Sequence, residues 1–136
     1  MGQHVFGCDI CQDVCPWNRR APITALQEFQ PRIFLSQEEK RTDTSLLPVE
    51  ETLFLPRLEW LASLSEAEFR EVFRGSPIKR TKWPGLVSNA CIALGNSSLR
   101  RSTAAQARII QLLERLETSP EQVIAESARW ALSRIQ

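Results

Sequence analysis

The sequence contains no apolar run that approaches the roughly 20 residues that a helix needs to cross a bilayer. Residues 1–17 also lack the basic and then apolar layout of a signal peptide. We therefore expect neither membrane spanning nor secretion. With 136 residues, 43% of them hydrophobic and 24% charged, the chain can build one modest core, alone or with a small appended piece.

Histidine is nearly absent, because His4 is the only one in the chain. A single histidine leaves little scope for histidine acid–base catalysis. The sequence also shows no Ser, His and Asp combination, no zinc-protease motif and no glycine-rich nucleotide loop. We therefore assign no catalytic residue, and we expect His4 to be solvated.

The chain has no marked excess of either charge, because 17 Lys and Arg face 16 Asp and Glu. The balance hides an asymmetry along the sequence. Residues 1–73 carry 7 basic and 12 acidic residues, a net charge of −5, whereas residues 74–136 carry 10 and 4, a net charge of +6. A polyanion such as nucleic acid is therefore a candidate partner of the second half.

Cysteine is scarce but clustered, because three of the four lie within eight residues, at Cys8, Cys11 and Cys15. Three thiols in one short loop fit a thiolate-ligated metal in a reducing cytosol better than a disulfide framework. The C-x2-C-x3-C-P string reproduces the end of the bacterial ferredoxin motif, whose last cysteine serves a second cluster. On this interpretation Cys8 and Cys11 bind one [4Fe–4S] cluster and Cys15 reaches another. Neither cluster could be completed by this chain alone.

Two other interpretations of these thiols remain open. A zinc site built from Cys8, Cys11, Cys15 and His4 is chemically reasonable, although zinc does not require the Cys-Pro ending. Free structural thiols are the second, although inert buried cysteines are usually dispersed. Cys91 differs from these three, because it lies within an apolar stretch, and we predict a core position for it.

The chain divides into three predicted parts. Residues 21–56 are a predicted connector, because prolines and a polar stretch interrupt regular structure there. Residues 57–136 are predicted to form a helical domain, and residues 1–20 the carboxy-terminal piece of a ferredoxin-type domain. Trp17 is predicted to pack against the protein rather than to contact a cofactor.

Helical patterns dominate from residue 57 onward, so we predict a mainly α protein. Leucines at three-residue spacing indicate a short helix around residues 58–64. Ser65 and Glu68 form a capping box before a second short helix, for which Gly75 is the stop. Longer helices are predicted at about residues 85–94, 102–116 and 120–135.

The ends of the longer helices also carry recognisable residues. Gly95 is the predicted stop of the first of them. Ser119 is the predicted N-cap of the last, with Pro120 at its first position and Gln122 completing a capping box.

Two of the predicted helices resemble each other at an offset of 38 residues. The offset aligns Leu86 with Ile124 and Ala90 with Ala128, together with other apolar and small positions. A period near 40 residues with two helices per unit is typical of HEAT-like repeats, although alanine-rich amphipathic helices also share periodicity by chance. We predict a small HEAT-like domain of one and a half units, which is too short to be stable without a cap.

A basic loop precedes the first of the longer helices. Its cations have no acid among them, and a tryptophan and a helix amino terminus follow. Cations neutralise a nucleic-acid backbone and free helix amides favour anions, so we predict a phosphate-binding surface. A solvated loop in which the tryptophan caps the core is the alternative. The predicted nucleic-acid-binding residues are Lys79, Arg80, Lys82 and Trp83, with Arg100 and Arg101 in the equivalent loop one helix later.

Residues 7–18 read GCDICQDVCPWN, and the helical tail carries Arg80-x-Lys82 and, at residues 89–96, NACIALGN. In these motifs, and over essentially its whole length, the chain resembles the carboxy-terminal part of the epoxyqueuosine reductase family. The resemblance implies a cytoplasmic iron–sulfur and cobalamin oxidoreductase that reduces epoxyqueuosine to queuosine in tRNA.

For the residues of this chain, the resemblance implies a ligand role in two [4Fe–4S] clusters, Cys8 and Cys11 for one and Cys15 for the other. It implies cobalamin near Asp9 and the anticodon stem-loop of tRNA at residues 79–83. The family's cobalamin domain, catalytic acid and earlier cysteines have no counterpart here. We therefore expect a fragment that is inactive alone and that belongs to a monomeric full enzyme with an amino-terminal cobalamin domain. The rival is a non-enzymatic HEAT-like binding module with a zinc site.

Overall fold

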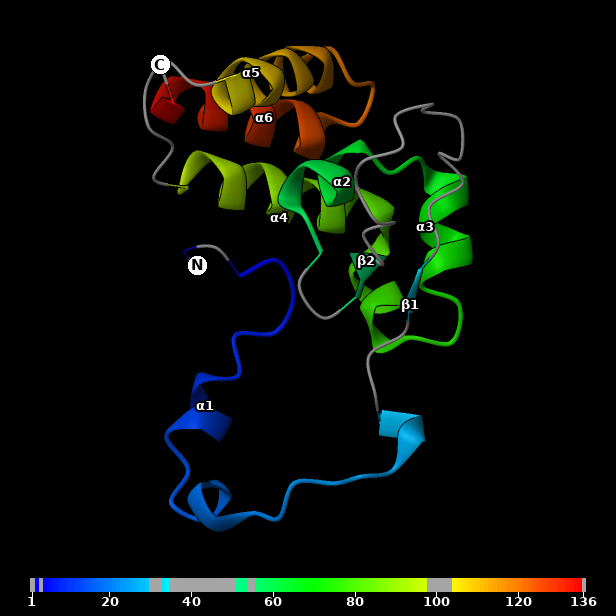
Figure 1. Ribbon diagram of the computed structural model, residues 1–136. Coiled ribbons are helices and arrows are strands. Elements are labelled where there is room, and N and C mark those ends of the chain that lie inside the picture. Colours follow the sequence, from blue (N-terminus) through cyan, green and yellow to red (C-terminus); the bar gives the residue numbers. More distant parts are fainter. Residues whose placement is uncertain are drawn as a thin grey trace. The chain divides into compact units, whose positions relative to one another are not determined.

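The computed structural model describes residues 2, 4–29, 33–34, 51–53, 56–97 and 104–135 (Figure 1). Contacts divide the chain into two compact units. The helical unit comprises Met1–Cys8 and Arg57–Gln136, and the connector unit comprises Asp9–Pro56. The three-part division at residues 20 and 56 stays a prediction. Arg100 and Arg101 lie outside the described residues.

The described residues are mainly helical, as predicted. No helix among them is long and apolar enough to span a membrane. The helical unit contains α2 (Leu58–Ser63), α3 (Glu66–Val72), the 3-10 helix η3 (Pro77–Thr81), α4 (Lys82–Gly95), α5 (Ala104–Glu117) and α6 (Gln122–Ile135). The connector unit contains α1 (Ile10–Asp13), η1 (Asn18–Arg20), η2 (Gln27–Phe29), β1 (Ile33–Phe34) and β2 (Glu51–Thr52).

The two strands were not predicted from the sequence. They pair in antiparallel fashion, with Ile33 opposite Thr52 and Phe34 opposite Glu51. Ile33, Phe34 and Thr52 are of residue types that favour the extended backbone.

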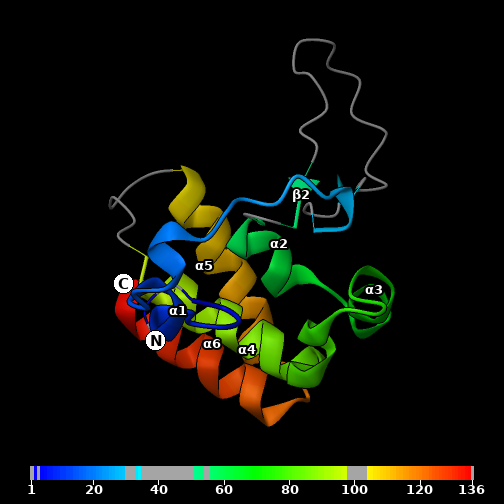
Figure 2. The ribbon, with the colours of Figure 1, turned by 90° about the horizontal axis from the view of Figure 1, so that it is seen from below.

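The core of the helical unit lies among four helices. Helix α6 packs against both α4 and α5, and α2 packs against the same two helices (Figure 2). Leu113 of α5 and Ile124 of α6 are fully buried there, and so is Cys91 of α4. The predicted core position of Cys91 is therefore confirmed.

Helices α4 and α6 approach each other through small residues. Ser127 donates its hydroxyl proton to the Val123 carbonyl at 2.8 Å, and its Oγ lies 2.7 Å from Ser88 Oγ. Because the single hydroxyl proton of Ser127 is already used, Ser88 is the donor between the two helices. Two of the seven pairs aligned by the 38-residue offset, Asn89 with Ser127 and Ile92 with Trp130, are not buried. The other five pairs are buried in both helices: Leu86 and Ile124, Val87 and Ala125, Ala90 and Ala128, Ala93 and Ala131, Leu94 and Leu132.

Gly95 ends α4 as predicted, but for a different physical reason. A Cβ atom at Gly95 would lie 2.9 Å from Ala131 Cα and 2.9 Å from Trp130 Cζ3, so glycine is needed for the close approach of α6. Gly75, in contrast, has a φ of 71° after the end of α3. It fulfils the predicted role of a left-handed stop.

The predicted capping box of α3 is confirmed. Ser65 Oγ accepts from the Glu68 backbone N–H at 3.3 Å, and the Glu68 carboxylate accepts from the Ser65 N–H at 2.7 Å. The Ser65 hydroxyl, followed by this backbone bond, lowers the pKa of the Glu68 carboxyl.

The capping box predicted for α6 is wrong. The Gln122 side chain turns forward and donates to Glu126 Oε1 at 2.8 Å, so it does not return to Ser119. Ser119 Oγ instead accepts from the Glu121 N–H at 3.3 Å. The helix begins at Gln122, which places Pro120 ahead of its first turn.

Candidate functional site

The four cysteines lie in two kinds of environment. Cys8 and Cys11 are exposed and Cys15 is half-buried, whereas Cys91 is buried. Burial raises the pKa of the Cys91 thiol to about 12, because a thiolate cannot be solvated in the core. A cysteine binds a metal as the thiolate, so only the three clustered cysteines are suited to ligation.

Asp9 shapes the turn that carries Cys11. Its backbone adopts a φ of 47°, a left-handed conformation that aspartate tolerates better than most residues. Its carbonyl accepts from the N–H groups of Gln12 at 2.8 Å and Asp13 at 2.9 Å. The structure thus gives Asp9 a backbone role, and its contact with a cofactor stays a prediction.

Asn18 closes the loop around Cys15. Its Nδ2 donates to the Gln12 carbonyl at 3.0 Å, and its backbone N–H donates to the Cys15 carbonyl at 3.1 Å. These two hydrogen bonds were not predicted from the sequence, in which Asn18 was noted only as part of a motif. An asparagine shortly after a Cys-Pro pair is the pattern that could have indicated it, because asparagine side chains readily bond to nearby backbone.

The candidate ligands do not converge on one point in the described residues. In the described ranges, no three His, Cys, Asp or Glu side chains are arranged to hold a metal ion. Cys8 ends one unit, whereas Cys11 and Cys15 belong to the other. The exposure and type of the thiols nevertheless fit a cluster with ligands from elsewhere. His4 is exposed, as predicted.

Three cations project from the start of the α4 region. Lys79 and Arg80 lie on η3, and Lys82 is the first residue of α4; all three are exposed. None of them forms an ion pair with an acid in the described part of the chain. Arg74, which precedes them, pairs with Glu71 at 2.7 Å.

Lys82 has an unusual backbone conformation. Its φ of 58° and ψ of 165° fall in a region that is nearly restricted to glycine. Thr81 fixes the preceding turn, because its Oγ1 donates to the Ile78 carbonyl at 2.7 Å. A lysine in this region is strained, and such strain is typical of functional positions.

Trp83 is partly committed to the fold. Its Nε1 donates to the Leu64 carbonyl at 2.6 Å, and the side chain is half-buried. The indole therefore anchors the start of α4 to the residue that follows α2. With its N–H engaged, Trp83 could contact a nucleotide only through its ring, and that contact stays a prediction.

Asn89 of α4 and Asn96, the C-cap of this helix, were also missed as interacting residues. Asn89 and Asn96 donate to backbone carbonyls of the segment that leads to Cys8. Their seven-residue spacing, which places both on one face of a helix, was the available indication.

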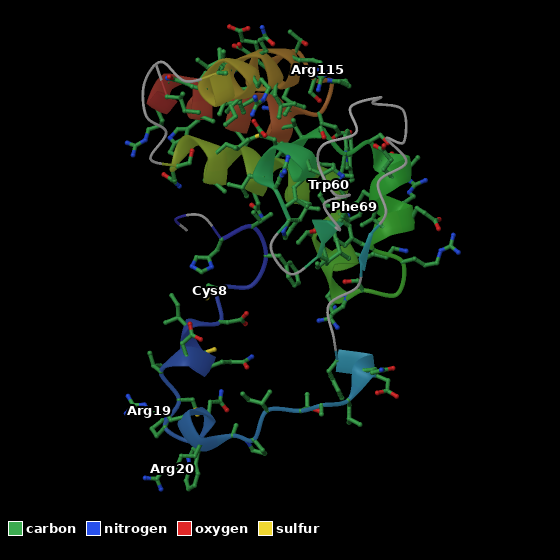
Figure 3. All side chains as sticks on the ribbon, in the orientation of Figure 1. Cys8, Arg19, Arg20, Trp60, Phe69 and Arg115 are labelled. Atoms are coloured by element: carbon green, nitrogen blue, oxygen red, sulfur yellow. The ribbon has the colours of Figure 1, made fainter. Side chains whose placement is uncertain are left out.

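Apolar side chains of the connector unit are exposed. The exposed fraction is 88% for Trp17, 99% for Ile23 and 73% for Phe29. The prediction that Trp17 packs is therefore wrong for this chain. Arg19 and Arg20 also project from η1 (Figure 3).

The chain is similar to proteins named epoxyqueuosine reductase. It is 35% identical over 136 residues to the protein of Francisella cf. novicida, covering 98% of this chain and 31% of that protein. It is 35% identical over 134 residues to the Pseudomonas aeruginosa protein, covering 98% and 30%. It is 34% identical over 97 residues to the Escherichia coli protein, covering 71% and 21%.

The chain spans less than a third of the length of these curated relatives. No model of a protein family matches it, and no solved structure matches it significantly.

Proposed function

We propose a function from one premise: the chain belongs to the epoxyqueuosine reductase family and corresponds to its carboxy-terminal part. The proposed function is a part in the reduction of epoxyqueuosine to queuosine in tRNA. In this role it supplies cluster ligands and a tRNA-docking helical domain to a cytoplasmic oxidoreductase. The observation that carries the proposal is similarity to the relatives over 98% of the chain. A non-enzymatic module with a zinc site is not favoured, because the relatives are named as reductases.

Cys8 and Cys11 would hold one [4Fe–4S] cluster and Cys15 a second. Exposed thiols and the loop closed by Asn18 support this assignment. When bound, such clusters would carry single electrons toward a cobalamin held by another part of the protein. Asp9 would lie beside this cobalamin. The contribution of this chain is to present the thiols, and the turn that begins at Asp9 orients Cys11.

Lys79, Arg80 and Lys82 would bind the phosphates of the tRNA anticodon stem-loop, with Arg100, Arg101 and the Trp83 ring extending the surface. Their exposure and lack of acidic partners among the described residues support this role. Lysine and arginine bind phosphate by charge, so the interaction would weaken with salt. The hydrogen bond of Trp83 to the Leu64 carbonyl fixes the start of α4 beneath these cations.

The helices that carry this surface would form a HEAT-like stack. The support is that aligned positions of α4 and α6, such as Ala90 with Ala128, are buried in both helices. Stacked helix pairs present their loops on a common side, which suits a long, charged ligand.

A chimera tests the proposed function. The matching region of the Pseudomonas aeruginosa relative is replaced by this chain, and reduction of epoxyqueuosine in tRNA is measured. Activity should be retained by the chimera and lost in its Cys8→Ser and Cys15→Ser variants, because serine cannot replace a thiolate ligand. The matched control is Cys91→Ala, which removes a core thiol and should leave activity in the folded protein.

Two results would contradict the proposal. One is a folded chimera without activity. The other is turnover by the isolated chain. Anaerobic reconstitution separates the metal alternatives, because cubane clusters absorb broadly at about 400 nm whereas a zinc site is colourless.

A further inference from the structure

The segment that precedes Cys8 is held by a side chain of α4 and by that of Asn96, which caps the end of this helix. Asn89 Nδ2 donates to the Val5 carbonyl at 2.8 Å, and Asn96 Nδ2 donates to the Gly2 carbonyl at 2.9 Å. Both asparagines are half-buried. Figure 1 shows this segment starting beside the carboxy-terminal end of α4. No backbone–backbone hydrogen bond holds residues 4–8 among the described residues, so the two side-chain amides supply the polar attachment.

The two donors follow one another along the helix and its end. Asn89 and Asn96 are separated by about two turns, a rise of about 10.5 Å, and their acceptors, Val5 and Gly2, are three residues apart in sequence. Because the later asparagine binds the earlier residue, the segment runs antiparallel to α4. Two successive contacts therefore fix both its position and its direction.

The pair is specific to α4 and is not a feature of the repeat. At the 38-residue offset, Asn89 aligns with Ser127 and Asn96 with Arg134. Ser127 bonds within the α4–α6 interface, and Arg134 lies over the ring of Trp130. Neither aligned residue supplies an amide, so the asparagines are not required merely to build a helix of this type.

We infer that Asn89 and Asn96 are positioning residues that fix the Cys8 segment to α4, the helix that also begins with Lys82. The inference rests on the proposed function for the ligand role of Cys8. Cys8 follows Val5 by three residues, so the anchored segment limits where its thiol can lie. One rigid helix thus carries the basic surface at its start and holds a proposed cluster ligand along its length.

The first test measures the attachment without metal. In the metal-free chain, ¹⁵N relaxation should show residues 4–8 as rigid, with order parameters of about 0.85, falling below about 0.6 in Asn89→Ala/Asn96→Ala. Asn89→Asp/Asn96→Asp is the second variant, because aspartate keeps the size but cannot donate. Asn18→Ala is the matched control: it removes an asparagine amide bond from the connector unit and should leave residues 4–8 rigid.

The second test measures the consequence for iron. In the chimera with clusters, the double variants should lose iron to a chelator about 30-fold faster, the ratio expected for two lost hydrogen bonds. The melting of the helical unit should be unchanged. Residues 4–8 that stay rigid in both variants, or that are mobile in the unaltered chain, would overturn the inference. So would an unchanged rate of iron loss in a variant with mobile residues 4–8. A chimera that assembles no cluster counts against the proposed function instead, because the relaxation result still decides the attachment.

Discussion

At the scale of single residues, the surroundings of each cysteine decide whether its thiol can bind a metal. Cys91 is enclosed by the α4 core, and its thiol pKa of about 12 keeps it protonated at physiological pH. Cys8 and Cys11 are exposed on short segments that make no core. The ligand assignment excludes Cys91, because a cysteine must lose its proton to bind a metal and burial opposes that loss.

Lys82 is the residue at which binding and stability should oppose each other. Lys82→Gly should raise the free energy of unfolding by about 1 kcal/mol, because glycine accepts the backbone conformation at this position without strain. The same change should weaken tRNA binding, since it removes an exposed cation. Denaturant unfolding and binding titration measure the two effects.

The matched control for this change is Lys79→Gly. It removes a similar exposed cation from η3, where the backbone has no positive φ. It should weaken binding without stabilising the fold. Equal stability changes in the two variants would show that the Lys82 backbone is not strained.

At the scale of elements, α4 combines three tasks. Its apolar face builds the core with α2 and α6, its first residues carry the basic surface, and its asparagines hold the segment before Cys8. Close packing against α6 is the condition for the other two, because a helix that shifts in the core moves everything attached to it.

Replacement by alanine should have opposite effects on stability at the two glycines of α4, Gly85 and Gly95. Gly95→Ala should destabilise the chain by about 1–3 kcal/mol, because the new Cβ would meet the α6 backbone at 2.9 Å. Gly85→Ala should stabilise it by about 0.5–1 kcal/mol, since alanine favours a helix and its Cβ would be 3.6 Å from Thr81 Cβ. Thermal unfolding of both variants measures the difference. Equal effects would contradict the close approach at Gly95.

At the scale of the whole molecule, charge is divided along the sequence, with −5 in residues 1–73 and +6 in residues 74–136. Several cations of the helical unit are neutralised locally. Arg70, Arg108 and Arg129 pair with Glu66, Glu59 and Glu117, respectively. The charge available to a polyanion is therefore concentrated in cations without such partners, among them Lys79, Arg80 and Lys82.

Replacing Lys79, Arg80 and Lys82 with alanine should lower the slope of log Kd against log salt for tRNA by about one unit per lost phosphate contact. The matched control replaces Arg70, Arg108 and Arg129 with alanine, which removes the same charge from paired positions. The control should change the slope less. Equal slopes in the two triple variants would exclude a docking role for Lys79, Arg80 and Lys82.

The family, the mainly helical class and the clustered thiols could all be predicted from the amino-acid sequence, because they depend on local spacing along the chain. The Ser65 capping box and the Gly75 stop could be predicted as well, since both depend on residues close together in sequence. The box predicted at Ser119 was wrong because Gln122 found a competing partner one turn ahead, in Glu126.

The partners that residues find across space could not be predicted from the sequence and are known from the folded structure. It gave Gly95 its role through contact with α6, committed the Trp83 N–H to the Leu64 carbonyl, and joined Asn89 and Asn96 to a segment over 80 residues away in sequence. The physical reason is that helix periodicity specifies which face is apolar, but not which distant backbone groups will meet the polar side chains beside that face.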